Sequence, residues 1–162
     1  MVAGSQRQIA FRLGTAVVVA LVCLTTWSAR VAAHCQVPCG IYDDGGRIQM
    51  LLEDTRTIQK ATASIEQLAS KTDAQSRNQL TRWVITKEQH ASHIITTVAE
   101  YFLTQKVKVV AAGENGHDAY LSHLADHHAV MAAAMRTKQK VSADAVSELQ
   151  KAIEKMAQHY TH

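Results

Sequence analysis

Acidic residues are absent from the first 33 positions of this 162-residue chain, and cysteine is absent after Cys39. The chain has a single proline, Pro38, and shows no internal repeat or low-complexity tract. The pattern C-x-x-C, which thioredoxin-like redox motifs and covalent haem attachment both require, does not occur. These absences exclude a repeat architecture, a thioredoxin-like site, attached haem and a disulfide framework spread along the chain.

The acid-free opening segment has the pattern of a secretory signal peptide. Arg7 and Arg12 precede the apolar run Leu13–Leu24, and the small residues Val31-Ala32-Ala33 follow after a short polar stretch. This order predicts cleavage between Ala33 and His34 and export to the periplasm or out of the cell. The alternative is an uncleaved membrane anchor, but the apolar run is shorter than the roughly 20 residues that span a bilayer.

Removing this leader changes the charge balance of the chain. The leader holds three of the 17 Lys and Arg residues and none of the 14 Asp and Glu residues. The remaining 129 residues therefore carry equal numbers of acidic and basic side chains, and their formal net charge is zero. A neutral balance gives no argument for nucleic acid or an anionic membrane as a partner, and the length suffices for one domain with a core.

The predicted new amino terminus opens the segment His34-Cys35-Gln36-Val37-Pro38-Cys39-Gly40-Ile41-Tyr42, which we call the hook. A chain that starts His-Cys offers a metal its α-amine, an imidazole, the Cys35 backbone nitrogen and the Cys35 thiolate, and Cys39 adds a second thiolate. Such donors suit a square-planar or tetragonal late transition metal better than the closed tetrahedral shell of structural zinc. Pro38 and Gly40 favour a tight loop around the second cysteine.

Beyond the hook the apolar residues recur at spacings of three and four, which predicts helices. Polar or glycine-containing breaks at 71–73 and 113–116 separate three of them, with Asp118 as a possible N-cap of the third and Ser142 of a fourth. We therefore expect an all-α, antiparallel up-and-down four-helix bundle over residues 43–162, preceded by a leader over 1–33 and the hook over 34–42. The stripes expected to face the core are Ile48, Leu51, Leu52, Thr55, Ile58, Ile65, Leu68 and Ala69; Leu80, Trp83, Val84, Ala91, Ile94, Ile95, Val98 and Phe102; Tyr120, Leu121, Leu124, Met131 and Met135; and Val146, Leu149, Ile153, Met156 and Tyr160.

The hook closely resembles the nickel hook of the nickel superoxide dismutase family, whose motif H-C-x-x-P-C-G-x-Y is matched at every fixed position. The resemblance implies a nickel ion, one per chain, with His34, Cys35 and Cys39 as its ligands. It also implies that Tyr42 lies over the open face of the metal and completes the catalytic set. The implied activity is the disproportionation of superoxide to O2 and hydrogen peroxide. The family's four-helix bundles assemble as homohexamers, so the resemblance implies the same assembly here, without nucleic acid and without a membrane anchor after processing.

A less specific resemblance continues past the hook, over Thr81–His90 and Glu100-Tyr101-Phe102. It implies that Tyr101 lies near the hook, although spacing alone is equally consistent with an aromatic residue on the core face. In the family, the axial histidine is held by a glutamate of the first helix and by an arginine from a neighbouring subunit. Those two positions fall on Gln49 and His90 in this chain, so the pattern is altered at both, and Glu53 is an alternative partner one turn beyond Gln49.

The histidines of the third helix raise the question of a second metal site. His123 and His127 are spaced i, i+4, which can chelate zinc or copper, but no acidic or cysteine ligand completes a recognisable signature. We expect these two, together with His128, His90 and His93, to be surface residues that face solvent or a neighbouring subunit.

Two other functions remain open from the sequence. An exported copper or nickel carrier would use the same amino-terminal chelate without turnover, although a carrier has no need of Tyr42 or of the fixed proline and glycine. A structural bundle with a Cys35–Cys39 disulfide is the second, although so small a loop would stabilise the fold little.

Overall fold

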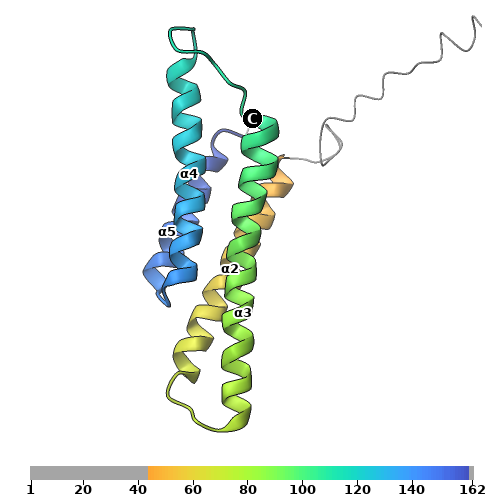
Figure 1. Ribbon diagram of the computed structural model, residues 1–162, viewed down its shortest axis with the longest axis vertical. Helices are drawn as coiled ribbons and strands as arrows, with labels where there is room; N and C mark the ends of the chain where they lie inside the picture. The colour runs from red at the N-terminus through yellow and green to blue at the C-terminus, as the bar shows by residue number, and fades with distance from the viewer. Residues whose placement is uncertain (1–43, 161–162) are drawn as a thin grey trace, which may run out of the picture. The chain divides into compact units, whose positions relative to one another are not determined.

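The computed structural model describes residues 44–160. This part of the chain contains the helices α2 (Asp44–Leu68), α3 (Ala74–Thr97), α4 (His117–Gln139) and α5 (Ala143–Ala157), and a π-helix, η1 (Val98–Lys106), that continues α3 (Figure 1). None of its helices is long and apolar enough to cross a membrane. The predicted leader, the hook and their boundaries lie outside the described residues.

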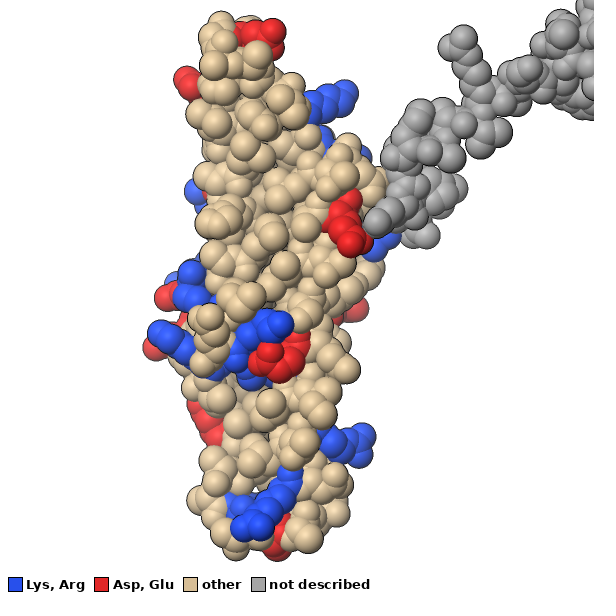
Figure 2. Space-filling model, viewed as in Figure 1, with Lys and Arg blue, Asp and Glu red and all other residues tan. Residues whose placement is uncertain are grey.

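The helices form the predicted up-and-down bundle. Helix α2 packs against α3, α3 against α4, α4 against α5, and α5 against α2. Each helix runs opposite to the one before it, and the carboxyl end of the described chain lies beside the end of α3 and η1 (Figure 1). On the face shown in Figure 2, basic and acidic side chains are interspersed over an otherwise uncharged surface. The all-α fold class predicted from periodicity is therefore confirmed.

The core follows the predicted stripes most closely on α5 and α2. On α5, Val146, Leu149, Ile153 and Met156 are all buried, as expected from their spacing. On α2 the buried stripe includes Ile48, Leu51, Thr55, Ile58 and Ile65. Each fully buried aliphatic side chain contributes about 1.5–3 kcal/mol relative to leaving it in water, so these stripes hold the bundle together.

Helix α4 departs from the prediction. Leu121 and Met135 were expected in the core but are 47% and 42% exposed, and Val84 of α3 is 38% exposed. The inner face of α4 is built instead largely from small or polar residues, which let the neighbouring helices approach closely. Those residues are Asp126, His127, Val130, Ala133, Ala134 and Thr137.

Of the two predicted N-caps, the structure confirms one, and it adds a third cap at Asp73. Asp73 caps α3 by accepting a hydrogen bond from the Ser76 amide at 2.9 Å. Hydrogen bonding from the Ser76 side chain, and then from its amide, lowers the pKa of the Asp73 carboxyl group. Ser142 caps α5, as predicted, by accepting from the Ala145 amide at 3.4 Å. The prediction of Asp118 as the cap of α4 was wrong. Gly116, with φ of 92°, reverses the chain directly ahead of the helix, which places Asp118 in the first turn, where it faces the positive end of the helix dipole.

Lys87 is a charged residue inside the bundle, with only 2% of its surface exposed. Its ammonium group lies 2.6 Å from the Thr137 carbonyl oxygen, 2.7 Å from that of Lys138 and 3.0 Å from a Glu88 carboxylate oxygen. It therefore satisfies two carbonyl groups that the end of α4 leaves without helical partners, and it places positive charge at the negative end of that helix. Through this contact α3 fixes the end of α4.

A buried histidine joins α4 to the residues that follow α5. His127 has no exposed surface, so the expectation that it lies at the surface was wrong, whereas His128 is exposed. The Nδ1 atom of His127 lies 2.6 Å from the His123 carbonyl oxygen, and its Nε2 atom lies 2.6 Å from the Tyr160 hydroxyl. Burial lowers the pKa of His127, which favours the neutral ring.

A carboxylate lies next to this histidine. Asp126 accepts from Lys155 at 2.7 Å and from His159 Nε2 at 2.9 Å. Burial alone would raise the pKa of Asp126, but the hydrogen bonds from these two partners outweigh it and lower the pKa. The ring of His159 also packs against His123, with 3.9 Å between ring centroids, and burial together with the charge of His159 lowers the pKa of His123.

We predict that the bundle loses stability as the pH falls below about 6.5. A histidine whose pKa is lower in the folded chain than its ordinary value of 6.5 binds fewer protons than it does when unfolded. Its contribution is therefore complete above that value and is lost as the pH falls toward the folded pKa. Thermal unfolding followed by circular dichroism should give a falling midpoint from about pH 7.5 to about pH 5.5.

The pH slope should be clearly smaller in His127→Gln, because this variant removes the buried ring. His128→Gln, which changes the exposed neighbour, should keep the slope of the unaltered protein. Because all three proteins have the same metal ligands, any pH dependence of metal binding cancels in the comparison. Equal slopes in the His127 and His128 variants would contradict the assignment.

Candidate metal centre

The residues predicted to hold the metal, His34, Cys35 and Cys39, lie outside the described residues, and so does Tyr42. Their chemistry fits a late transition metal, since two thiolates and the nitrogens of a free amino terminus form a strongly electron-donating set. Within residues 44–160, no group of three or more His, Cys, Asp or Glu side chains is arranged to hold a metal ion. The structure does describe the bundle surface at which the hook joins the first helix.

The junction is formed by Asp44, the first residue of α2. One of its carboxylate oxygens accepts a hydrogen bond from the Tyr101 hydroxyl at 2.5 Å, and the other lies 2.9 Å from the Lys106 ammonium nitrogen. Tyr101 and Lys106 both belong to η1, so this carboxylate ties the start of α2 to the π-helix. Bonds to a charged acceptor are about twice as strong as neutral ones.

Tyr101, expected from the family resemblance to lie near the hook, is a core residue of the bundle. It is buried, with 7% of its surface exposed, and its ring meets the Phe102 ring edge-on at 5.0 Å between centroids. The guanidinium carbon of Arg47, on α2, lies 5.0 Å from the centre of the Tyr101 ring. Tyr101 therefore belongs to the core, and its hydroxyl binds the residue that begins α2. The expected contact of Tyr101 with the hook lies outside the described residues.

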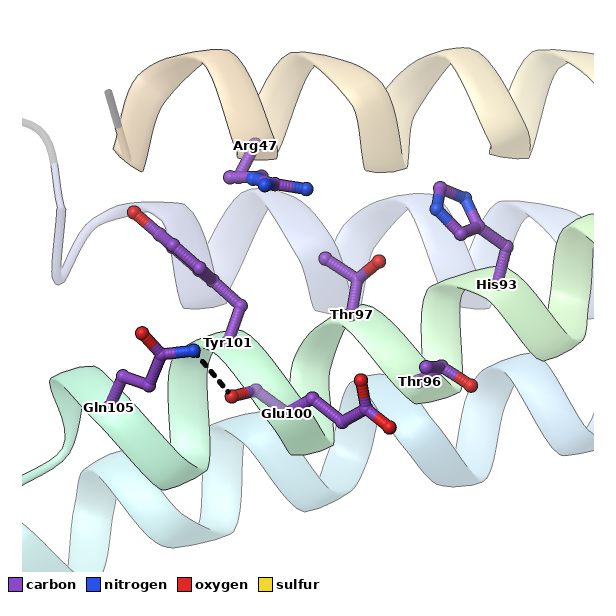
Figure 3. A pocket seen from close by; sticks show the side chains of 7 residues that line it. All are labelled: Arg47, His93, Thr96, Thr97, Glu100, Tyr101 and Gln105. Carbon is purple, nitrogen blue, oxygen red and sulfur yellow. Dashed lines mark hydrogen bonds between the residues drawn. The ribbon is translucent and has the colours of Figure 1, made fainter. Parts of the chain in front are cut away.

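A cavity of about 170 Å³ opens beside Tyr101, between α2 on one side and α3 with η1 on the other (Figure 3). Tyr101 and Gln105 stand at one end, His93 at the other, and Arg47 reaches across from α2. The side chains that line it are mostly polar. The cavity offers room for water or a small anion next to the start of α2.

The π-helical winding of η1 sets the positions of these residues. Its hydrogen bonds join residues five positions apart in the sequence, as in the bond from the Val107 amide to the Phe102 carbonyl oxygen. Two side chains use the same spacing, Thr104 to the Ala99 carbonyl at 2.7 Å and Gln105 to the Glu100 carbonyl at 3.1 Å. Short π-helical turns occur often at functional sites. The wider turn here carries both Tyr101 and Phe102 into the bundle.

His90, which the sequence offers as a candidate partner of His34, shares the carboxylate of Asp54 with His93. Its Nδ1 atom lies 2.6 Å from one oxygen of Asp54, and the Nδ1 atom of His93 lies 2.6 Å from the other. A carboxylate only accepts, so both rings donate from Nδ1 and their Nε2 atoms remain available to accept. Both rings are partly exposed, whereas Asp54 is buried.

The structure also describes the other two candidate partners of His34. Gln49 is exposed, and Glu53 is exposed with its carboxylate 3.8 Å from Arg56 on the same helix. Sequence reasoning missed Asp54, although a signal was present. Asp54 falls on the inner stripe of α2 between Leu51 and Ile58, where an acidic residue must find partners.

Comparison with known families gives one match. The sequence profile of the family described as nickel-containing superoxide dismutase matches residues 29–162, which include the hook and all the described helices. Comparison with curated proteins and with solved structures gave no match.

We predict that Tyr101→Phe lowers the free energy of unfolding by about 1.5–3 kcal/mol, the usual contribution of a hydrogen bond to a charged group. The ring and its contact with Phe102 are retained, so the helical circular dichroism should not change. Urea unfolding of the variant measures the effect. Tyr120→Phe is the matched control, because no hydrogen bond of its hydroxyl is found among the described residues, and it should change stability little. An equal loss in both variants would refute the role of the Asp44 carboxylate.

Proposed function

The chain belongs to the nickel-containing superoxide dismutase family, and on this basis we propose that the hook is its catalytic centre, with His34, Cys35 and Cys39 as the nickel ligands. The protein is a nickel-dependent superoxide dismutase, an oxidoreductase that converts two superoxide anions and two protons to O2 and hydrogen peroxide. The observation that carries the site assignment is the coincidence, within the matched region, of a predicted cleavage point with the donor set His34-Cys35.

When bound, nickel would supply a one-electron Ni(II)/Ni(III) couple for the conversion of superoxide. The thiolates of Cys35 and Cys39, with the deprotonated Cys35 amide, would hold it and would lower the potential of this couple. The imidazole of His34 would favour the higher oxidation state. Thiolates in contact with superoxide and peroxide are prone to oxidation, and binding to the metal in a narrow site protects them.

Tyr42 is close in sequence to the described part of the chain, because it precedes Asp44 by two residues. Asp44 is in turn held by Tyr101 and Lys106. We assign Tyr42 the role of restricting access of small anions to the metal. The hydrogen-bonded carboxylate of Asp44 fixes the start of α2, to which the Tyr42 segment is joined.

Positive charge near the start of α2 favours an anionic substrate. The Lys106 ammonium group forms an ion pair with the Asp44 carboxylate. The Arg47 guanidinium group lies over the ring of Tyr101. Cationic side chains beside a cleft raise the local concentration of an anion and its rate of arrival. The carboxylates of Asp44 and Glu100 offset part of this charge.

His90 is proposed as the hydrogen-bond partner of the His34 imidazole. Asp54 holds its ring by Nδ1, which leaves Nε2 at the surface as an acceptor or a donor according to protonation. It thus offers a hydrogen-bonding group to His34 of the partner subunit, in place of the arginine implied by the family resemblance. A carboxylate behind a histidine is a common way to fix the orientation of the ring.

The leader and the assembly complete the proposal. The acid-free segment 1–33 is assigned as a signal peptide that directs export and exposes His34 on removal. A homohexamer is proposed for the mature chain, because large apolar side chains remain exposed on several helices. These include Met50, Val84, Ile85, Leu121 and Met135. The carrier hypothesis is not favoured, since the family is one of enzymes.

We predict that a mature chain beginning with Ala33 ahead of His34 folds normally and loses nearly all activity. The added residue converts the α-amine into an amide, a poor donor, and displaces the imidazole from its chelate ring. The value of kcat/KM, followed by pulse radiolysis, should fall by about a hundredfold or more, equivalent to about 3 kcal/mol of transition-state stabilisation. The chain beginning at His34 is the matched control and should hold about one nickel per chain.

A further variant separates the enzyme from a carrier. His34→Ala at the same starting position should retain nickel bound by the amine and thiolates but turn over slowly. Full activity of the Ala33-extended chain would remove the amine from the mechanism. Tight nickel binding by the His34-initiated chain with no catalysed superoxide decay would favour the carrier instead.

We predict that the mature protein is a hexamer in solution. Multi-angle light scattering at micromolar concentration should give a mass six times that of the chain. The hook needs a surface to close against, and a neighbouring subunit provides one. A fully active monomer at this concentration would contradict the assembly.

A further inference from the structure

The turn ahead of α4 carries a site of covalent modification, the peptide bond between Asn115 and Gly116. We propose that Asn115 deamidates spontaneously through a cyclic imide, which leaves aspartate or isoaspartate at this position in aged protein. The reaction needs only water, and neither the hook nor the metal takes part in it, so the inference is independent of the proposed function. No other asparagine of the chain is followed by glycine.

A tight turn presents this pair of residues to solvent. The His117 amide donates to the Glu114 carbonyl oxygen at 3.2 Å, so Asn115 and Gly116 occupy the centre of the turn. Gly116 has φ of 92° and ψ of 0°, values typical of the third residue of a type II turn, where glycine is favoured. The backbone therefore favours glycine at the position where it also makes the preceding asparagine reactive.

The reaction starts at the backbone nitrogen of Gly116. This nitrogen gives its proton to hydroxide and attacks the side-chain carbonyl carbon, Cγ, of Asn115. A bond forms between the nitrogen and Cγ, and the bond from Cγ to Nδ2 breaks. The Nδ2 atom leaves as ammonia with a proton from water, which restores the hydroxide. The product is a five-membered succinimide ring.

Water then opens the ring in one of two ways. Addition to Cγ breaks the bond from Cγ to the Gly116 nitrogen, which regains a proton, and gives aspartate. Addition to the backbone carbonyl carbon breaks the bond from that carbon to the same nitrogen and gives isoaspartate. In isoaspartate the main chain runs through the former side chain and is one methylene longer. Either product carries a new negative charge, and no oxidant or reductant is involved.

The surroundings leave the attacking nitrogen accessible. Asn115 and Gly116 are both exposed, and among the described residues no hydrogen bond of the Asn115 side chain or of the Gly116 amide is found. A Cβ atom placed on Gly116 would meet no other atom within 4 Å, so nothing crowds this position. An open hollow of about 490 Å³, lined by residues 113–118, gives water access for the hydrolysis.

Ring closure requires the turn to open briefly, because the Asn115 side chain and the Gly116 nitrogen must come into one plane. Within the described chain, the turn is closed by the 3.2 Å bond from His117 to Glu114. Glycine has no Cβ atom, so it adopts the rotated conformation without a steric penalty. Exposed turns open with free energies at the low end of those found in a folded protein.

The only other asparagine of the chain, Asn78, provides a comparison within the same molecule. It is also exposed, but it lies inside α3, and Gln79 follows it instead of glycine. Ring closure at Asn78 requires local unfolding of the helix, and the side chain of Gln79 hinders the attack. We therefore expect modification at Asn115 and not at Asn78.

The two products change the start of α4 in different ways. Aspartate at position 115 adds a negative charge at the positive end of the helix dipole, close to Asp118, and leaves the turn intact. Isoaspartate lengthens the turn, so the hydrogen bond between the His117 amide and the Glu114 carbonyl loses its geometry. The His117 ring, whose Nδ1 atom lies 2.9 Å from the Val110 carbonyl oxygen, would be displaced with it.

The test incubates the purified protein at mildly acidic and at mildly basic pH and follows it by peptide mass mapping. The peptide that contains Asn115 should gain the mass difference between an amide and a carboxyl group. Its rate should exceed that of the Asn78 peptide by about tenfold or more, and it should rise with pH because hydroxide takes the proton. Equal rates at the two asparagines would overturn the proposal.

A synthetic peptide with the sequence of residues 111–120 gives the rate of the unconstrained chain. The rate at Asn115 in the folded protein should lie within about tenfold of the peptide rate, because the turn opens readily. A slower rate than this would show that the turn blocks ring closure, and the proposal would be wrong.

Two variants separate the modification from its effect on α4. Asn115→Gln must close a six-membered ring, a much slower reaction, so it should not form the acidic species that the unaltered protein accumulates in ion-exchange chromatography. Asn115→Asp reproduces the aspartate product alone. Amide hydrogen exchange over residues 117–120 should be several-fold faster in aged unaltered protein than in Asn115→Asp, because only the former contains isoaspartate. Acidic species forming equally fast in Asn115→Gln would place the reaction at another residue.

Discussion

The arrangement at the start of α2 depends on a single carboxylate. Asp44 is the first described residue after the hook, and it joins the start of α2 to Tyr101 and Lys106 of η1. Tyr101 and its neighbour Phe102 are core residues, and Phe102 packs in turn against Tyr160. The position from which the hook departs is therefore set by the packing of α2, η1 and the residues after α5.

Several further buried polar groups connect the helices in the same way. Lys87 of α3 binds the last carbonyls of α4, Asp54 of α2 binds two histidines of α3, and Asp126 of α4 binds Lys155 and His159 beyond it. An apolar core tolerates small shifts of one helix along another, whereas a buried charge loses its partner if the helix slides. We infer that these contacts select one register among similar packings, which is the best-attested use of buried charge in helical assemblies.

Much of this fold and of the family assignment can be predicted from the amino-acid sequence, and the exceptions have physical causes. The stripe on α5 is predicted correctly because its core face is aliphatic at strict helical spacing, and the hook motif by itself indicates the family that the profile match confirms. The inner face of α4 cannot be found by the same means, since its alanines and His127 do not stand out by hydrophobicity and the larger Leu121 and Met135 are exposed. The cap at Gly116 depends on a backbone angle, and the partner of His90 depends on which residue of α2 lies opposite. Both follow from tertiary packing, which local patterns do not encode.

The π-helix also has a consequence for tolerance to changes in chain length. A helix wound with five-residue hydrogen bonds holds more residues in each turn than an α-helix of the same rise. Shortening η1 by one residue can therefore be absorbed by rewinding the turn as α-helix, with the loop after Lys106 keeping its attachment. An added residue in α2 or α5 has a larger effect. It rotates the following part of the α-helix by about 100° and turns its core stripe out of the bundle. Of the described helices, η1 is thus the one that best accommodates the loss of a residue.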